Sequence, residues 1–145
     1  TGFAIVDLTA PTVSSVSTTA DNQSSVSITD NISVTFSEEM DNTTVSTNSA
    51  DTSCSGSFQL SSNNFSSCVQ MSSSPSASNS NKTFTVTPSA SLSTGTTYKI
   101  RVTTGVKDTS GNQLSSQYEL TNGFTTELPI FVAVTTLPTK SILDT

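Results

Sequence analysis

The side chains best suited to chemistry in this chain are oxygen donors gathered in one short segment. Asp108, Ser110 and Asn112 alternate there, and calcium binds six to eight oxygens from carboxylates, amides and similar groups. Aspartate and asparagine also form turns by hydrogen bonding to nearby backbone. The segment therefore predicts either a calcium site or a polar turn, and the turn is the simpler interpretation. Other carboxylates that could join such a site are those of Asp7, Glu38, Glu39 and Asp41.

Catalytic constellations find little support in the residue types. The chain has no histidine, so none of its serines can belong to a Ser-His-Asp triad. A serine–lysine pair would need a lysine placed beside a nucleophile, and no motif in the sequence does this. Glu38 and Glu39 are adjacent, so on a strand they would point to opposite faces. We therefore expect no enzyme activity, no catalytic residues and no cofactor apart from the calcium considered above.

The two cysteines, Cys54 and Cys68, either form a disulfide or remain two unrelated thiols. Two cysteines without histidine cannot supply the four ligands of a zinc site. A disulfide suits an acidic, lysine-poor chain with the composition of a secreted protein. It would close a loop of about 15 residues and contribute on the order of 3 kcal/mol in the chain-entropy model. We expect the disulfide, and with it an extracellular or cell-surface location.

The overall composition bounds the domain count and the partners. The 145 residues are enough for one domain with short flanks. About two residues in five are Ser or Thr, and the net charge is −6 with only five basic residues. This balance provides no basic patch for nucleic acid or for an anionic membrane surface. The longest apolar run, Ile130–Val134, is too short to span a membrane, so we expect no membrane insertion.

The apolar residues alternate with polar ones, which predicts an all-β fold with a thin core. Asp41 is a candidate N-cap of one helical turn, and Leu92 is expected to fill the core. The polar stretch 72–81 is expected to be an exposed, mobile loop. A first, edge strand is expected around Pro11. The other predicted strands lie near Ser25–Ile28, Ile32–Phe36, Gly56–Leu60, Cys68–Met71, Thr83–Thr87, Tyr98–Val102 and Tyr118–Phe124.

Several short motifs occur in an order that resembles a bacterial immunoglobulin-like domain, of the type found in surface-layer and multi-repeat surface proteins. The resemblance covers Ala10 to Thr126 and implies an Ig-like antiparallel β-sandwich of about seven strands with Greek-key connections. It also implies a non-catalytic spacer, stalk or adhesion module of a secreted or surface protein. The motifs are Ala10–Val13, Ile32–Asp41, Phe84–Pro88, Gly95–Tyr98, Val106–Asp108, Gly111–Asn112 and Phe124–Thr126.

Two flanks remain outside this domain, at residues 1–9 and 127–145. The plain interpretation is that they are linkers to neighbouring domains. For the C-terminal flank, the sequence leaves open that it begins a following domain or adds a strand to this one. The alternative is strand addition, in which the apolar residues of a flank pair with a sheet edge of an identical subunit and build a filament. The residues that would carry this role are Phe3, Ile5, Ile130 and Val132.

The sequence leaves a second function open, namely a binding module for host protein or glycan. Its contact surface would be the loops 54–68 and 72–81, which depart from the family pattern. Five N-x-Ser/Thr sequons add the question of glycosylation, although many arise by chance in so Ser/Thr-rich a chain. They begin at Asn22, Asn31, Asn42, Asn64 and Asn81.

Overall fold

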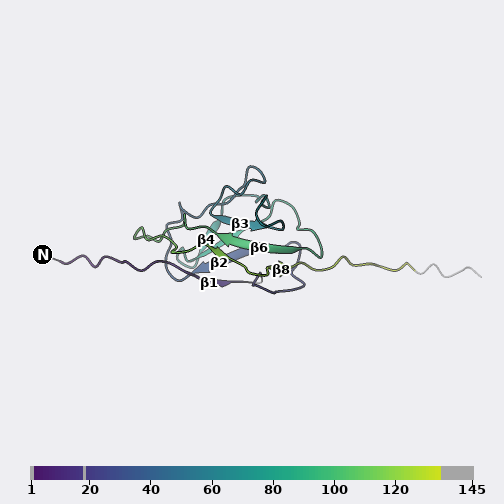
Figure 1. The fold of residues 1–145 in the computed structure, drawn as a ribbon, viewed down its shortest axis with the longest axis horizontal. Helices are drawn as coiled ribbons and strands as arrows, with labels where there is room; N and C mark the ends of the chain where they lie inside the picture. The colour runs from purple at the N-terminus through teal and green to yellow at the C-terminus, as the bar shows by residue number, and fades with distance from the viewer. Residues whose placement is uncertain (1, 18, 135–145) are drawn as a thin grey trace, which may run out of the picture.

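The computed structural model describes residues 2–17 and 19–134, and within them eight strands form two antiparallel sheets packed as a sandwich (Figure 1). The first sheet has the order β1-β2-β5-β4, and the second has β3-β6-β7 with β8 also paired to β6. The chain crosses between the sheets after β2, after β3 and after β5. The strands are β1 (Val13–Val16), β2 (Ile32–Phe36), β3 (Phe58–Ser61), β4 (Ser76–Ser78), β5 (Thr83–Val86), β6 (Thr97–Val102), β7 (Tyr118–Glu119) and β8 (Phe124–Thr125).

Alternation of apolar and polar residues explains the first sheet. The apolar residues of β2 and β5 are buried, and the Ser and Thr residues between them point to the outer face. Val34 pairs with Phe84 across these two central strands, and the Phe36 and Phe84 rings meet edge to face at 5.9 Å. Both edge strands, β1 and β4, have one neighbour in the sheet.

The second sheet is built on β6, which pairs with three other strands. Beyond β8, Val26 forms a parallel bridge with Thr126, so the segment before β2 runs beside the last strand. Gly123, just before β8, packs directly against the backbone of β6 and has a φ of 86°. A Cβ atom there would lie 2.4 Å from the carbonyl oxygen of Tyr98, which leaves room only for glycine.

The core lies between the sheets and draws apolar residues from both. Leu92 is buried in it as predicted. The structure contains no helix among the described residues, and so none that is long and apolar enough to cross a bilayer. The largest fully buried side chains are Phe36, Phe58, Phe84, Phe124, Ile32, Met40, Leu60, Met71, Ile100, Val34, Val86 and Val102.

Two predicted strands are reduced to single bridges. In the segment 25–28 only Val26 pairs, because Ser25 has a φ of 55° and the chain turns again at Asp30, whose N–H donates to the Ser27 carbonyl. In the segment 68–71 only Met71 pairs, and its partner is Pro88. Proline has no N–H to continue a ladder, so this pairing stops there.

Two further expectations differ from the structure. Asp41 begins a turn rather than a helical segment. The Thr44 N–H donates to the Asp41 carbonyl, and the Asp41 N–H donates to the Lys107 carbonyl. The polar stretch 72–81 is not a plain loop, since it contains β4, which pairs with β5. A three-residue strand of small polar residues has too few alternating positions to be recognised from sequence.

Candidate functional site

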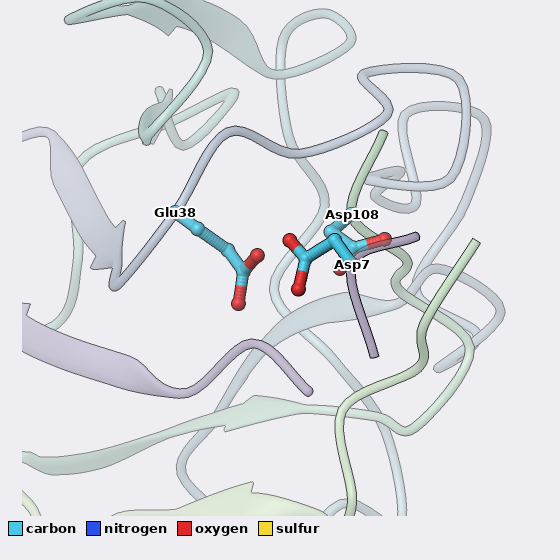
Figure 2. A group of neighbouring side chains, drawn as sticks. All are labelled: Asp7, Glu38 and Asp108. Carbon is cyan, nitrogen blue, oxygen red and sulfur yellow. The ribbon is translucent and has the colours of Figure 1, made fainter. Parts of the chain in front are cut away.

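Three carboxylates converge where the N-terminal flank meets the sandwich (Figure 2). Asp7 comes from the flank, Glu38 follows β2, and Asp108 lies in the turn after β6. One carboxylate oxygen of each lies within 4.8 Å of the others. We call these three residues the acidic cluster. Asp7 is exposed, Glu38 is half-buried and Asp108 is buried, so solvent screens the three charges unequally.

Asp108 owes its position to turn hydrogen bonds. Its Oδ1 accepts from the backbone N–H groups of Ser110 and Asn112, each at 2.8 Å, and its Oδ2 accepts from the Asn112 side-chain amide at 2.8 Å. Burial acts to raise the pKa of Asp108, but the hydrogen bonds from Asn112, Ser110 and Gly111 outweigh it and the pKa is lowered. The ionised form of Asp108 is therefore favoured by hydrogen bonds from its own turn rather than by contact with solvent.

The ligand set expected from the loop is arranged differently from a calcium loop. Ser110 turns its backbone N–H toward Asp108. The Asn112 amide also points its nitrogen at Asp108, and it donates to the Asp7 carbonyl at 3.0 Å. The structure thus joins Asp108 to Asp7 and Glu38 rather than to the side-chain oxygens of its own loop. Of the other carboxylates considered, Glu39 accepts from the Asn81 amide at 3.4 Å, and Asp41 accepts from Thr43.

The acidic cluster perturbs Glu38 most clearly. Burial, followed by the nearby charges of Asp7 and Asp108, raises the pKa of Glu38 above its ordinary value. Such a group takes up a proton or a cation more readily than an isolated glutamate does. Three carboxylates supply fewer oxygens than the six to eight that calcium takes, so a calcium ion at the acidic cluster would need further ligands.

The apolar flanks leave the sandwich in opposite directions (Figure 1). The four side chains predicted for strand addition are all exposed: Phe3 by 100%, Ile5 by 97%, Ile130 by 90% and Val132 by 78%. The large apolar residues on either side of them are exposed as well. Burying such surface would be favourable, so each flank is suited to a contact with another domain or subunit.

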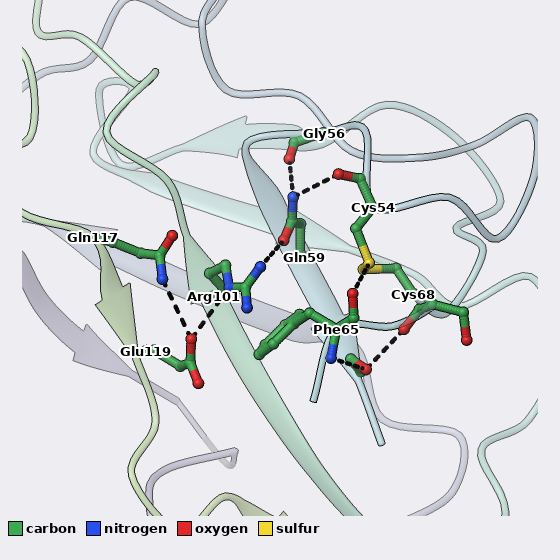
Figure 3. A network of polar contacts seen from close by, with 10 residues as sticks. Cys54, Gly56, Gln59, Phe65, Cys68, Arg101, Gln117 and Glu119 are labelled. Atoms are coloured by element: carbon green, nitrogen blue, oxygen red, sulfur yellow. Dashed lines mark hydrogen bonds and ion pairs between the residues drawn. A yellow bond between two sulfur atoms is a disulfide. The ribbon is translucent and has the colours of Figure 1, made fainter. Parts of the chain in front are cut away.

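Cys54 and Cys68 form a disulfide, with an S–S distance of 2.06 Å and a Cα–Cα distance of 5.1 Å. Figure 3 shows how the loop between them packs on the outer face of the second sheet. The Gln59 amide donates to the carbonyls of Cys54 and Gly56, at 2.9 and 2.7 Å. Phe65, near the end of the loop, lies against the Arg101 guanidinium at 3.6 Å.

Sequence reasoning missed this clamp of Gln59, Phe65 and Arg101. Arg101 also forms an ion pair with Glu119 at 3.2 Å, on the neighbouring strand β7. Alternation along β6 puts Arg101 on the outer face, between the buried Ile100 and Val102, but alternation cannot show that a loop folds back over that face. The only available signal was the loop itself, since a disulfide that closes so few residues must keep them near the strand they leave.

Four of the five sequon asparagines are exposed, and the fifth, Asn81, is half-buried beside Glu39. The exposed positions lie outside the strands, in the segments between β1 and β2, between β2 and β3, and between β3 and β4. They are Asn22, Asn31, Asn42 and Asn64.

The strand pairing and the two-sheet core define an Ig-like antiparallel β-sandwich. Residues 7–126 match the sequence profile of the bacterial Ig-like domain family, and the chain belongs to that family. A comparison with curated protein sequences finds no significant match. The disulfide is consistent with an extracellular location.

Solved structures give the same result for the fold. The N-terminal part of the bacterial S-layer protein SbsC is 26% identical over 84% of this chain and 24% of that chain, with a TM-score of 0.54. The S-layer protein rSbsC(31-844) is 26% identical over 84% of this chain and 14% of that chain, with a TM-score of 0.53. The chain therefore resembles domains of multidomain S-layer proteins and spans under a quarter of their length.

A more distant similarity extends the fold beyond S-layers. Native alpha-2-macroglobulin from Escherichia coli, spanning domains MG0-NIE-MG1, is 17% identical over 83% of this chain and 33% of that chain, with a TM-score of 0.52. At this identity the similarity concerns the fold alone.

Proposed function

We propose that this chain is a non-catalytic structural module of a multidomain bacterial surface protein, acting as a spacer, a stalk or a subunit of a filament. The observation that carries this proposal is the placement of the two flanks, which leave opposite ends of the sandwich with their apolar side chains exposed. Modules entered and left in this way extend a chain lengthwise. The resemblance to domains of S-layer proteins supports the same role.

The flanks also offer a means of assembly. β1 and β4 are the edges of the first sheet, and an edge strand can accept an added strand from another chain. A head-to-tail contact of this kind does not close, so it propagates. In this proposal Phe3, Ile5, Ile130 and Val132 are buried against the next subunit.

Light scattering coupled to size exclusion tests the proposal on the whole chain. A filament subunit gives oligomers whose mass rises with concentration, and deletion of residues 1–8 and 128–145 returns a monomer. A monomer of 15.1 kDa at every concentration would eliminate self-assembly and leave the spacer role. Unchanged oligomers after both deletions would show that the flanks are not the contact.

A binding module is the second candidate, because the disulfide loop is presented as an ordered surface by Gln59 and Arg101. In this case host protein or glycan would be recognised through the loops. The surrounding protein distinguishes the two roles: a spacer is expected among similar domains, whereas a binding tip is expected to be terminal and unique.

A further inference from the structure

One turn of the sandwich contains an exposed asparagine followed by a glycine. Asn122 and Gly123 lie between β7 and β8, and no other asparagine in the sequence precedes a glycine. Asn122 is exposed, whereas Gly123 is buried. No described residue forms a hydrogen bond with the Asn122 side chain. The side-chain amide of Asn122 is therefore accessible, and it belongs to the residue directly before the Gly123 nitrogen.

An asparagine in this setting can lose its amide by reaction with its own backbone. The Gly123 nitrogen attacks the Asn122 Cγ and forms a C–N bond, and ammonia leaves with the proton that the nitrogen gives up. Water then opens the cyclic imide at either carbonyl, which gives aspartate or isoaspartate. Glycine hinders this ring closure least, because it has no Cβ atom. The sequence and exposure of the turn make Asn122 a candidate for deamidation.

Asp21 holds this turn in place. Its Oδ1 accepts from the backbone N–H groups of Asn122 and Gly123, at 2.8 and 2.7 Å. The next residue, Asn22, donates its N–H to the Gly123 carbonyl at 2.8 Å. Gly123 also packs against Tyr98, where a Cβ atom would lie 2.4 Å from the carbonyl oxygen. The Gly123 nitrogen is therefore fixed by contacts that ring closure would have to break.

The Asp21 carboxylate opposes the reaction in two ways. Attack requires the nitrogen and the carbon to reach a near-attack geometry, and the two hydrogen bonds hold the Gly123 nitrogen toward Asp21 instead. The nitrogen must also lose its proton, and a carboxylate 2.7 Å away disfavours the negative charge that results. The fold thus places a guard beside a reactive pair of residues.

We propose that Asn122 is a deamidation site that Asp21 keeps closed in the folded domain, and that deamidation prevents the turn from closing again. The new carboxylate would stand beside that of Asp21, and isoaspartate would lengthen the backbone next to Gly123. The segment after Asp21 runs beside β8, where the Val26 N–H donates to the Thr125 carbonyl at 3.1 Å. Deamidation therefore loosens the last strand of the sandwich. This inference does not depend on the proposed spacer function.

Peptide mapping by tandem mass spectrometry tests the proposal on the whole chain, aged at pH 8 with its disulfide intact and well below its Tm. The reference is the rate of Asn122 conversion in the same chain unfolded by urea. The key variant is Asp21→Ala, which removes both acceptor contacts, while Asp21→Asn keeps an acceptor oxygen without the charge. The matched control is Asp51→Ala, because Asp51 also accepts from a turn, at 2.8 Å from the Ser53 nitrogen, between β2 and β3.

We expect Asn122 to convert readily in urea and much more slowly in the folded wild type. Conversion in the folded Asp21→Ala variant should be roughly tenfold faster than in the wild type, since two hydrogen bonds no longer oppose it. The Asp21→Asn variant should fall between the two, and Asp51→Ala should match the wild type. Deamidated wild type, separated by ion exchange, should have a lower Tm than the unmodified chain. Circular dichroism confirms that each variant is folded.

Three results would overturn the proposal. The first is conversion of the folded wild type as fast as in urea. The second is an unchanged or slower rate in Asp21→Ala, and a slower rate would mean that Asp21 takes up the proton and promotes the reaction. The third is equal acceleration in Asp51→Ala, which would point to a general loss of stability. An unchanged Tm after deamidation would overturn the part of the proposal that concerns the turn.

Discussion

At the scale of single residues, Glu38 is the side chain whose environment most clearly opposes its ionised form. Its pKa is raised by burial and by Asp7 and Asp108, so the fold favours the protonated carboxyl. The resulting stability is complete below the ordinary pKa of glutamate, and it is lost as pH rises through the raised pKa. At neutral pH the ionised Glu38 therefore reduces the free energy of unfolding.

Replacing Glu38 by glutamine should relieve this repulsion. We expect Glu38→Gln to have a higher Tm than the wild type at pH 7, with the difference disappearing as pH falls below the pKa of Glu38. Thermal unfolding between pH 3 and pH 8 measures both effects. Asp108 has the opposite effect on the pH dependence of stability, because its lowered pKa gives stability that is lost as pH falls. We expect this contribution in the wild type and in the Glu38→Gln variant alike.

Glu39→Gln is the matched control, since it makes the same change in net charge at a side chain that faces Asn81 instead. An equal rise in Tm for both variants would point to net charge rather than to the acidic cluster. Millimolar calcium provides a second comparison: a cation held by the three carboxylates would raise the Tm of the wild type more than that of the Glu38→Gln variant. Equal shifts would indicate ordinary screening.

Gly123 is a second position where one residue determines local structure. Its φ of 86° and the Tyr98 carbonyl leave no space for a Cβ atom. We expect Gly123→Ala to destabilise the domain by about 1–3 kcal/mol, the cost of strained backbone, as measured by urea unfolding. Gly111→Ala is the comparison, because Gly111 also has positive φ but open space around it. We expect it to lower the free energy of unfolding by less, and the difference between the two variants gives the cost of the steric clash at Gly123.

At the scale of elements, the sequence predicted the longer strands, missed β4, and merged β7 and β8 into one strand over Tyr118–Phe124. Alternation over five or six residues was enough for β2 and β6, where buried apolar residues repeat at every second position. β4 and β7 have three and two residues, and they exist because a longer neighbour provides the pairing. Such strands depend on tertiary structure, which a local pattern does not contain.

The disulfide loop is the element whose removal we expect to matter most for stability. A variant with Cys54→Ser and Cys68→Ser loses the constraint on a short loop, which corresponds to about 3 kcal/mol in the chain-entropy model. Chemical denaturation should show a lower midpoint with nearly unchanged slope. The same variant should also release Phe65 from Arg101, since the 3.6 Å contact between them is made by the loop.

Arg101→Lys separates these two effects, because it keeps the charge opposite Glu119 but weakens the stacking of a planar guanidinium on Phe65. We expect it to cost less than the disulfide does. If Arg101→Lys were as destabilising as the double serine variant, the clamp and not the covalent bond would hold the loop.

At the scale of the whole molecule, the sandwich and the flanks make separate contributions. The core is drawn from residues between Val26 and Phe124, whereas the large apolar side chains of both flanks are exposed. In the sequence the flank residues stand outside the motifs that resemble the family. The acidic cluster could not be anticipated, because it depends on where the flank joins the sandwich, with the Asp7 carbonyl accepting from the Asn112 amide.

Deleting the flanks should therefore change solubility and association without unfolding the domain. We expect removal of residues 128–145 to leave the free energy of unfolding within about 0.5 kcal/mol, as for surface changes that touch no core residue. Binding of a hydrophobic dye should fall at the same time.

Removal of residues 1–8 differs, because it takes away Asp7 and relieves the charge repulsion on Glu38. That deletion should raise Tm at pH 7 in the wild type but less in the Glu38→Gln variant. A large loss of stability from either deletion would mean that the flanks belong to the folded domain and are not available to a neighbour.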